Sequence, residues 1–181
     1  MKFFLNLFVV LFIAATLFAG RANAGLDEGI SAYKAADYAK ALKELQPLAE
    51  QGNAKAQYIL GNMYFYGEGV NQDYQEAFRW IKKVAEQGDA EAQYILGTFY
   101  FFGKGVAQDQ REAFTWLKKA ADQGDPDAPY SLGIMYYYGD GVAQDKQEGV
   151  AWYKKAADRG NADAQNALKE LGINYSIQKK E

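Results

Sequence analysis

Hydrophobic and polar positions recur along most of the chain with a constant period. Trp80, Trp116 and Trp152 are each 36 residues apart, and the same pattern surrounds each of them. An Ala-rich segment with a Leu-Gly pair leads to a Gly-x-Gly-Val motif, and an Asp-x-x-Glu motif then opens a second apolar segment. Repeats of roughly 20 to 50 residues are typical of solenoids, in which each unit buries its apolar face against its neighbours. The pattern predicts an all-α fold, an α/α superhelical solenoid of helix-turn-helix repeats.

The capping residues and glycines set the predicted domain boundaries. Residues 25–52 lack the Gly-x-Gly-Val loop and are interpreted as a tight hairpin that caps the N-terminal end. Residues 161–172 contain only a first helix and are assigned as the C-terminal capping helix, and residues 173–181 as a frayed tail. The three full repeats lie between them, at 53–88, 89–124 and 125–160.

Each repeat is predicted to contain two helices with favourable ends. An Asn or Asp precedes the first helix, where its side chain can accept a backbone N–H. In the third repeat we place Pro126 at the first helical position, where a missing N–H costs little. The leading glycine of Gly-x-Gly-Val can adopt the left-handed conformation that ends a helix, and Asp-x-x-Glu resembles a capping box. The expected caps are Asn53, Asp89, Asp125 and Asn161 for the first helices and Asp73, Asp109 and Asp145 for the second.

Two residues of the third repeat depart from this pattern. Pro129 replaces a glutamine of the other repeats, and its ring disfavours helical geometry at Ala128. Gly149 replaces an alanine and costs up to about 1 kcal/mol of helix propensity. We therefore expect the third repeat to be the least tightly held.

The first 24 residues form a separate segment. Lys2 precedes an apolar run that leads to Ala22-Asn23-Ala24, a small-x-small cleavage pattern. Residues 1–24 are therefore predicted to be a signal peptide, and the protein to be exported to the periplasm or secreted. An uncleaved anchor is the alternative, since about 18 apolar residues approach the length of a membrane span. If the segment is cleaved, we expect the protein to contact a membrane only through this segment, before cleavage.

The composition excludes several kinds of chemistry. The chain has no histidine and no cysteine, which excludes catalysis by these nucleophiles, imidazole or thiolate zinc sites, and disulfides. A net charge of −3 without a basic run argues against nucleic acid as a partner. We expect no cofactor and no metal.

The second repeat reads Ala92-Gln93-Tyr94-x-Leu96-Gly97-x-x-Tyr100-x-x-Gly103-x-Gly105-Val106, followed by Asp109, Ala113, Trp116 and Lys119. This sequence resembles the Sel1-like repeat, a relative of the tetratricopeptide repeat, and residues 25–52 resemble a tetratricopeptide hairpin. The resemblance implies that the first helices line a concave surface, and that the protein acts as an adaptor in a bacterial envelope or signalling complex. Some exported relatives have a disulfide in each repeat, and some of those have been assigned β-lactamase or penicillin-binding activity. Because this chain has no cysteine, we do not transfer that activity to it.

The related tetratricopeptide pattern also implies which residues face a partner. It places the Leu-Gly pair in the core and three neighbouring positions, spaced by 4 and 3 residues, on the groove side. In this chain most of those positions are aromatic, and the rim residues Lys55, Glu91, Asp127 and Asp163 are mostly acidic. The expected groove residues are Tyr33, Tyr58, Asn62, Phe65, Tyr94, Thr98, Phe101, Tyr130, Ile134 and Tyr137.

A competing interpretation assigns the aromatic residues to packing. Aromatic side chains at helical spacing are usually part of a core, and the three tryptophans are interpreted in this way. On the same reasoning, one further column of aromatic residues forms wedges between successive repeats. That column consists of Tyr66, Phe102 and Tyr138.

Three classes of function remain after these steps. We predict a scaffold that captures a protein or peptide in the groove, because rigid aromatic side chains supply contact area at low entropic cost. The alternative is a module that binds cell-wall or exopolysaccharide glycans by stacking. A hydrolase is the third class, with Asp125 and Asp127 as paired carboxylates, but a carboxylate at a helix N-terminus is favoured by the helix dipole. We therefore predict that the protein is not an enzyme.

Overall fold

The computed structural model describes residues 24–175, and these are helical, in the turns between helices, or in the short segment after the last helix. Almost all of the predicted signal peptide, and residues 176–181 of the predicted tail, lie outside the described residues. The chain divides into two compact units at residue 72. In the first unit, a helical segment at 24–34 is followed by α2 (Tyr38–Glu50) and α3 (Ala54–Tyr66). None of the described helices is both long and apolar enough to cross a membrane.

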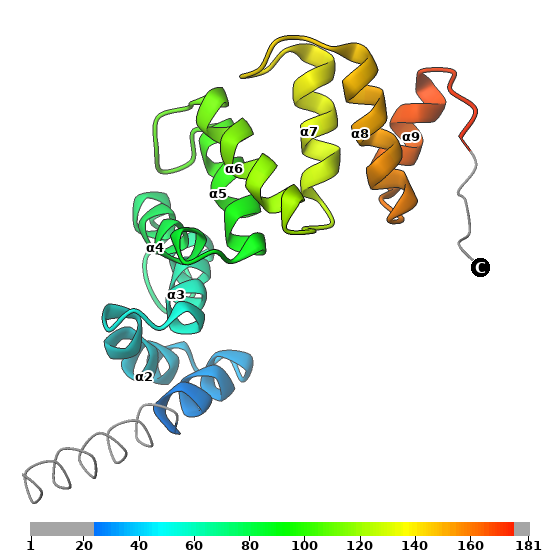
Figure 1. The fold of residues 1–181 in the computed structure, drawn as a ribbon. Helices are drawn as coiled ribbons and strands as arrows, with labels where there is room; N and C mark the ends of the chain where they lie inside the picture. The colour runs from blue at the N-terminus through cyan, green and yellow to red at the C-terminus, as the bar shows by residue number, and fades with distance from the viewer. Residues whose placement is uncertain (1–23, 176–181) are drawn as a thin grey trace, which may run out of the picture. The chain divides into compact units, whose positions relative to one another are not determined.

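The second unit contains the remaining helices in sequential order. Helices that follow one another in the sequence pack against one another throughout this unit (Figure 1). Small and aliphatic side chains of α6 and α7 form one continuous core with Trp152 of α8, so the predicted all-α packing of helical pairs is confirmed. The helices are α4 (Tyr74–Glu86), α5 (Ala90–Phe102), α6 (Gln110–Asp122), α7 (Ala128–Tyr138), α8 (Lys146–Asp158) and α9 (Ala162–Glu170).

Most helix ends have the caps that the sequence predicts. The Asp109 carboxylate accepts the backbone N–H groups of Arg111 and Glu112 at 2.9 and 3.1 Å. The first helices begin in the same way at Asn53, Asp89 and Asn161. Gly103 ends α5 with φ of 66°, in the left-handed region that glycine adopts without strain. Local hydrogen bonding thus sets the length of each helix.

The predicted start of α7 is wrong. Helix α7 begins at Ala128, so Pro126 precedes the helix instead of occupying its first position. The cause is Pro129, which has no N–H to donate to the carbonyl of Asp125. In the second repeat the equivalent bond joins the Gln93 N–H to the Asp89 carbonyl at 3.0 Å. Without this bond the first turn does not close, and α7 has 11 residues where α5 has 13.

The Gly-x-Gly-Val loops do more than end a helix. Gly105 and Gly141 both have positive φ, and each lies against the beginning of the second helix of the preceding repeat. A Cβ on Gly105 would lie 1.9 Å from the Tyr74 carbonyl oxygen. The residue before each glycine adds a side-chain contact, with Lys104 over the Tyr74 ring at 5.1 Å. The second glycine therefore allows the loop to dock on the preceding repeat.

Gly149 has a packing role that compensates for its low helix propensity. A Cβ at this position would lie 2.9 Å from the carbonyl oxygen of Gly133 and 2.9 Å from the backbone nitrogen of Tyr137. The backbones of α7 and α8 therefore approach more closely at Gly149 than an alanine would allow. Tyr153 fills the space beside them and is itself buried.

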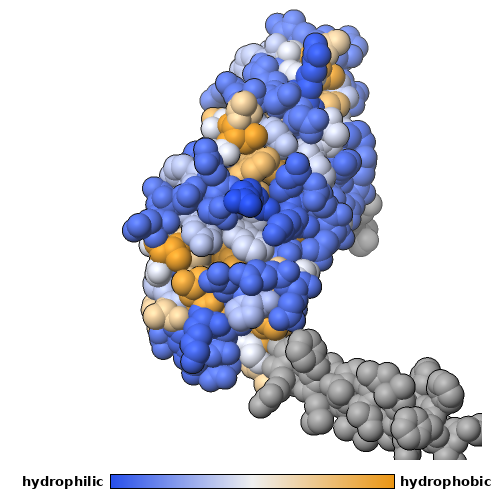
Figure 2. Space-filling view, turned by 90° about the vertical axis from the view of Figure 1, so that its left-hand side faces the viewer, coloured by the Kyte–Doolittle hydropathy of each residue, from blue (hydrophilic) through white to orange (hydrophobic). Residues whose placement is uncertain are grey.

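The interpretation of Tyr66, Phe102 and Tyr138 as wedges is wrong. Their side chains are 65, 67 and 65% exposed, far more than a residue packed between repeats. On the face shown in Figure 2, hydrophilic residues dominate and apolar residues form small separate patches. Among the tryptophans, Trp152 is buried, whereas Trp80 and Trp116 are half-buried, and a lysine lies over each indole ring at 3.9 to 4.3 Å. Exposed aromatic surface is thus concentrated at the ends of the first helices.

Candidate functional site

A cavity of about 280 Å³ lies among α5, α6, α7 and the start of α9 in the second unit. Its walls are mainly apolar and aromatic, with carboxylates at Asp127 and Asp163. The full lining consists of Tyr94, Thr98, Phe101, Phe102, Leu117, Asp127, Tyr130, Ser131, Ile134, Met135, Asn161 and Asp163.

Five of the groove residues predicted from the sequence meet in this cavity. Tyr94, Thr98 and Phe101 come from α5, and Tyr130 and Ile134 from α7. Their spacing along each helix places them on one face, and the two faces meet because α5 and α7 both pack against α6. Each side chain is half-buried, which leaves part of it accessible from the cavity.

The other predicted groove residues lie elsewhere. Tyr137 lines a different hollow with Lys146, Val150 and Ile173, and its ring lies 6.3 Å from that of Tyr153. In the first unit, the Tyr33 hydroxyl donates to the Glu68 carboxylate at 2.8 Å, so it helps to hold the loop at Glu68. The three predicted residues of α3 are each half-buried: Tyr58, Asn62 and Phe65.

The cavity also contains residues that the sequence analysis did not assign to it. Phe102 adds a second ring beside Phe101, edge to face with centroids 5.0 Å apart. Ser131 adds a hydroxyl, and Leu117 and Met135 close the floor from the core. Phe102 belongs to the column of exposed aromatic residues that are 36 residues apart. That regular spacing was the signal that could have identified Phe102 as a site residue.

Burial, and after it the nearby carboxylates, raise the pKa of the tyrosine hydroxyls in the cavity. Burial raises the pKa of Tyr94, a hydrogen bond from Ser131 lowers it, and the carboxylates of Asp127 and Asp125 raise it again. Burial also raises the pKa of Tyr130, with a further contribution from Asp163. Both hydroxyls therefore stay protonated at neutral pH, and the fixed charges at the cavity are carboxylates.

Asp125 is not available as a catalytic carboxylate. Its side chain is buried and accepts the N–H groups of Asp127 at 3.0 Å and Ala128 at 2.8 Å. Burial raises its pKa, and the two N–H donors lower it. Since its carboxylate already accepts two backbone donors, Asp125 serves to begin α7.

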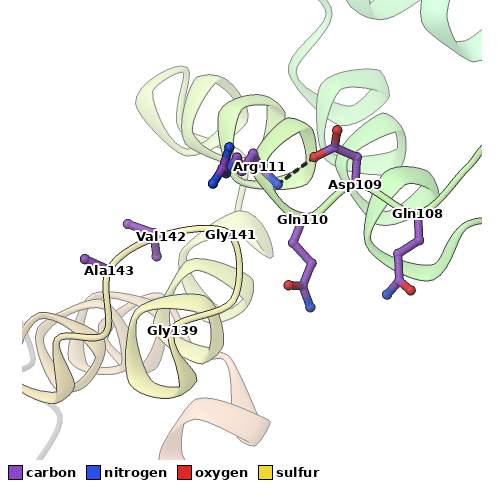
Figure 3. Close-up of a pocket in the computed structure, with 8 residues that line it drawn as sticks. All are labelled: Gln108, Asp109, Gln110, Arg111, Gly139, Gly141, Val142 and Ala143. Atoms are coloured by element: carbon purple, nitrogen blue, oxygen red, sulfur yellow. Dashed lines mark hydrogen bonds between the residues drawn. The ribbon is translucent and has the colours of Figure 1, made fainter.

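A larger hollow of about 680 Å³ lies where the loop at 139–143 faces the start of α6 (Figure 3). Three of the polar side chains in its lining already have partners within the fold. Asp109 caps α6, as the dashed line in Figure 3 indicates, and the Gln108 amide donates to the Phe101 carbonyl at 2.7 Å. Gln110 donates to Asp140 at 3.4 Å. This hollow is part of the loop docking on the preceding repeat, so the aromatic cavity is the candidate site.

A comparison with protein families gives three matches within the chain. Residues 54–89, 90–125 and 126–161 each match the Sel1 repeat, and together they cover more than half of the chain. The chain belongs to the Sel1 repeat family. It is a Sel1-like repeat scaffold, and Sel1 repeats generally mediate protein interactions and are usually non-catalytic. No curated protein sequence matches it.

Solved Sel1 repeat structures share its fold. The antigen c5321, described as a protective antigen present in uropathogenic Escherichia coli strains, is 36% identical, with a TM-score of 0.79 over 88% of this chain. A Sel1 repeat protein from Oxalobacter formigenes is 40% identical, with a TM-score of 0.63 over 71% of this chain and 97% of that one. The cysteine-rich protein B of Helicobacter pylori is 29% identical, covering 70% of this chain and 96% of that one, with a TM-score of 0.54. The chain spans only 36% of the length of c5321.

Proposed function

We propose that this Sel1 repeat chain is an exported scaffold that captures a protein or peptide partner at the aromatic cavity of its second unit, within a bacterial envelope or signalling complex. The observation that carries the proposal is the meeting of Tyr94, Thr98, Phe101, Tyr130 and Ile134 around one hollow. Recognition sites are typically concave and mostly apolar, with a few polar groups that fix orientation.

Two further observations support this proposal. Phe102 presents a side chain that is 67% exposed at the edge of the cavity, and buried aromatic anchors dominate the binding energy of many protein interfaces. Export is supported by the apolar segment that ends in Ala22-Asn23-Ala24. It is also consistent with similarity to a chain described as a protective antigen.

Selection from a library of phage-displayed peptides tests the site directly and requires no choice of partner. We expect the chain to enrich peptides whose binding falls about tenfold or more in Thr98→Arg, because the long side chain fills the cavity. Thr115→Arg is the matched control. Both threonine hydroxyls donate to a carbonyl of their own helix, at 2.7 and 2.9 Å, but Thr115 is exposed on α6 and lies outside the cavity. Equal binding by the two variants would reject the cavity as the capture site.

Glycan binding is the second candidate function, favoured by the exposed rings of Phe102 and Tyr138 in the second unit. Flat exposed rings can stack on sugars as well as on apolar side chains. Titration with peptidoglycan fragments and acidic polysaccharides, followed by tyrosine fluorescence, tests this function. Saturable quenching that disappears in Phe102→Ala would support it, and no response to any glycan would eliminate it.

A further inference from the structure

We infer that the aromatic cavity binds a cationic side chain of the partner, arginine in preference to lysine. This inference rests on the proposed capture function and specifies the chemistry of the captured segment. The rings of Tyr94, Phe101 and Tyr130 face one hollow that also has the carboxylates of Asp127 and Asp163 in its lining. A cation over a ring face is attracted by the ring quadrupole. A planar guanidinium can stack on a ring and pair with a carboxylate at the same time, which an ammonium cannot do as well.

The distribution of charge in the second unit explains why the cation has to come from a partner. Helices α5 and α7 carry Glu91 as their single charged residue, whereas the second helices of the repeats carry nine basic residues. No basic side chain is among the residues that line the cavity. The nine basic residues are Arg79, Lys82, Lys83, Arg111, Lys118, Lys119, Lys146, Lys154 and Lys155.

The two carboxylates of the cavity are suited to a ligand. Asp127 directly precedes α7 but makes no side-chain capping bond, because Asp125 takes that role. Asp163 lies in the first turn of α9, and both side chains are exposed. Two exposed carboxylates in the lining of an apolar hollow leave excess negative charge there, which a guanidinium would partly offset.

The size of the cavity also favours one long side chain. Its volume of about 280 Å³ is close to the lower limit of roughly 300 Å³ for small-molecule pockets. The chain itself uses the same contact on its second helices, where Lys83, Lys119 and Lys155 lie 3.9 to 4.3 Å from the centroids of tryptophan rings. The aromatic cavity offers this contact to another molecule.

Four pentapeptides provide the test, each with glycine at the outer positions and Arg, Lys, Leu or Glu at the centre. Binding to the full chain is measured from the amide NMR shifts of Thr98 and Ser131, which lie in the cavity. We expect the Arg peptide to bind at least about fivefold more tightly than the Leu and Glu peptides, with Lys between them. The double variant Asp127→Asn/Asp163→Asn should weaken the Arg peptide about tenfold, since both charges are lost.

Glu148→Gln is the matched control for charge, because Glu148 is an exposed carboxylate in the first turn of α8, outside the cavity. It should leave the affinity for the Arg peptide within about twofold, as expected for a screened surface charge. An unchanged amide spectrum away from the cavity shows that the double variant is folded.

Two negative outcomes separate this inference from the proposed function. If the Leu peptide binds as tightly as the Arg peptide and the double variant keeps that affinity, the cation assignment is wrong but capture at the cavity stands. If no peptide shifts Thr98 or Ser131, and Thr98→Arg leaves phage selection unchanged, both are wrong.

Discussion

The second and third repeats begin their first helices with different hydrogen bonds. In the second repeat, the Gln93 amide donates to the Ala85 carbonyl at 3.2 Å, and Gln123 donates to the Gln93 side chain at 2.6 Å. In the third repeat, Pro129 and Arg159 occupy the two corresponding positions. Arg159 donates to the Asp125 carbonyl at 3.2 Å and to the Gly124 carbonyl at 3.4 Å.

The comparison shows that two substitutions compensate each other across 30 residues of sequence. Pro129 removes both the backbone donor and the side-chain amide of the glutamine it replaces. The carbonyl of Asp125 would then lack a donor in a partly buried place, which costs free energy. Arg159 is long enough to reach that carbonyl from the end of α8. The third repeat therefore keeps its junction with a different donor.

The interiors of the two repeats differ as well. In the second repeat, Leu117 of α6 packs on Gly97 of α5, and the buried Ala113 occupies the position of Gly149. In the third, Gly149 allows the backbones of α7 and α8 to meet, and Tyr153 covers Gly133. The same helical hairpin is thus packed once with aliphatic side chains and once with a glycine and an aromatic ring.

The largest expected effect is that of Gly149→Ala. Helix propensity alone would stabilise the variant by about 1 kcal/mol. The new Cβ, however, would lie 2.9 Å from backbone atoms of Gly133 and Tyr137, and overpacking of this kind typically costs about 1 to 3 kcal/mol. Because backbone cannot rotate away as a side chain can, we expect a cost at the upper end of that range, and a net loss of about 2 kcal/mol in the free energy of unfolding by urea.

Ala113→Gly is the matched variant in the second repeat. It should cost about 1 kcal/mol through helix propensity, without any clash. If Gly149→Ala stabilised the protein instead, the close approach of α7 and α8 would not be required by their packing.

The next largest effect is expected for Arg159→Ala, at about 1 to 2 kcal/mol. This substitution removes the guanidinium, which donates to the Asp125 carbonyl in place of the backbone N–H that Pro129 lacks. Gln123→Ala is the control and should cost less, since the Gln93 amide keeps its bond to Ala85. Urea unfolding of both variants measures the difference, and equal losses would show that the arginine has no compensating role.

Much of the fold could be predicted because its determinants are local. An Asp or Asn side chain bonds N–H groups two or three residues away, as Asp109 does, and Gly103 ends α5 through its own φ. The sequence pattern therefore identified the helices and most of their ends. Gly105 and Arg159 act on residues about 30 positions away, on Tyr74 and Asp125. A pattern read within one repeat does not reveal such partners.

The candidate site was predictable to a similar degree. Helical spacing placed Tyr94 and Phe101 on one face of α5, but the closure of the cavity depends on which helices are neighbours. Asp163 reaches the cavity because its helix, α9, packs against α8, and α8 in turn packs against α7. Tyr137 shares the spacing of the groove residues and yet lines another hollow, with Lys146. Tyr94 and Tyr137 are both half-buried, and what separates them is the packing of the neighbouring helices, which spacing does not determine.

The smallest expected effect, and the most direct test of compensation, is that of Pro129→Gln in two backgrounds. Alone, the glutamine restores a donor to the Asp125 carbonyl, which Arg159 already contacts, so we expect a gain of no more than about 0.5 kcal/mol. In Arg159→Gln the same change should recover about 1 kcal/mol, because the carbonyl then lacks its guanidinium donor. Urea unfolding of the four proteins gives the coupling energy. Amide NMR should also show α7 extended toward Pro126 wherever residue 129 is glutamine. Additive effects would mean that the proline and the arginine are independent, and that the two repeats differ only by chance at this junction.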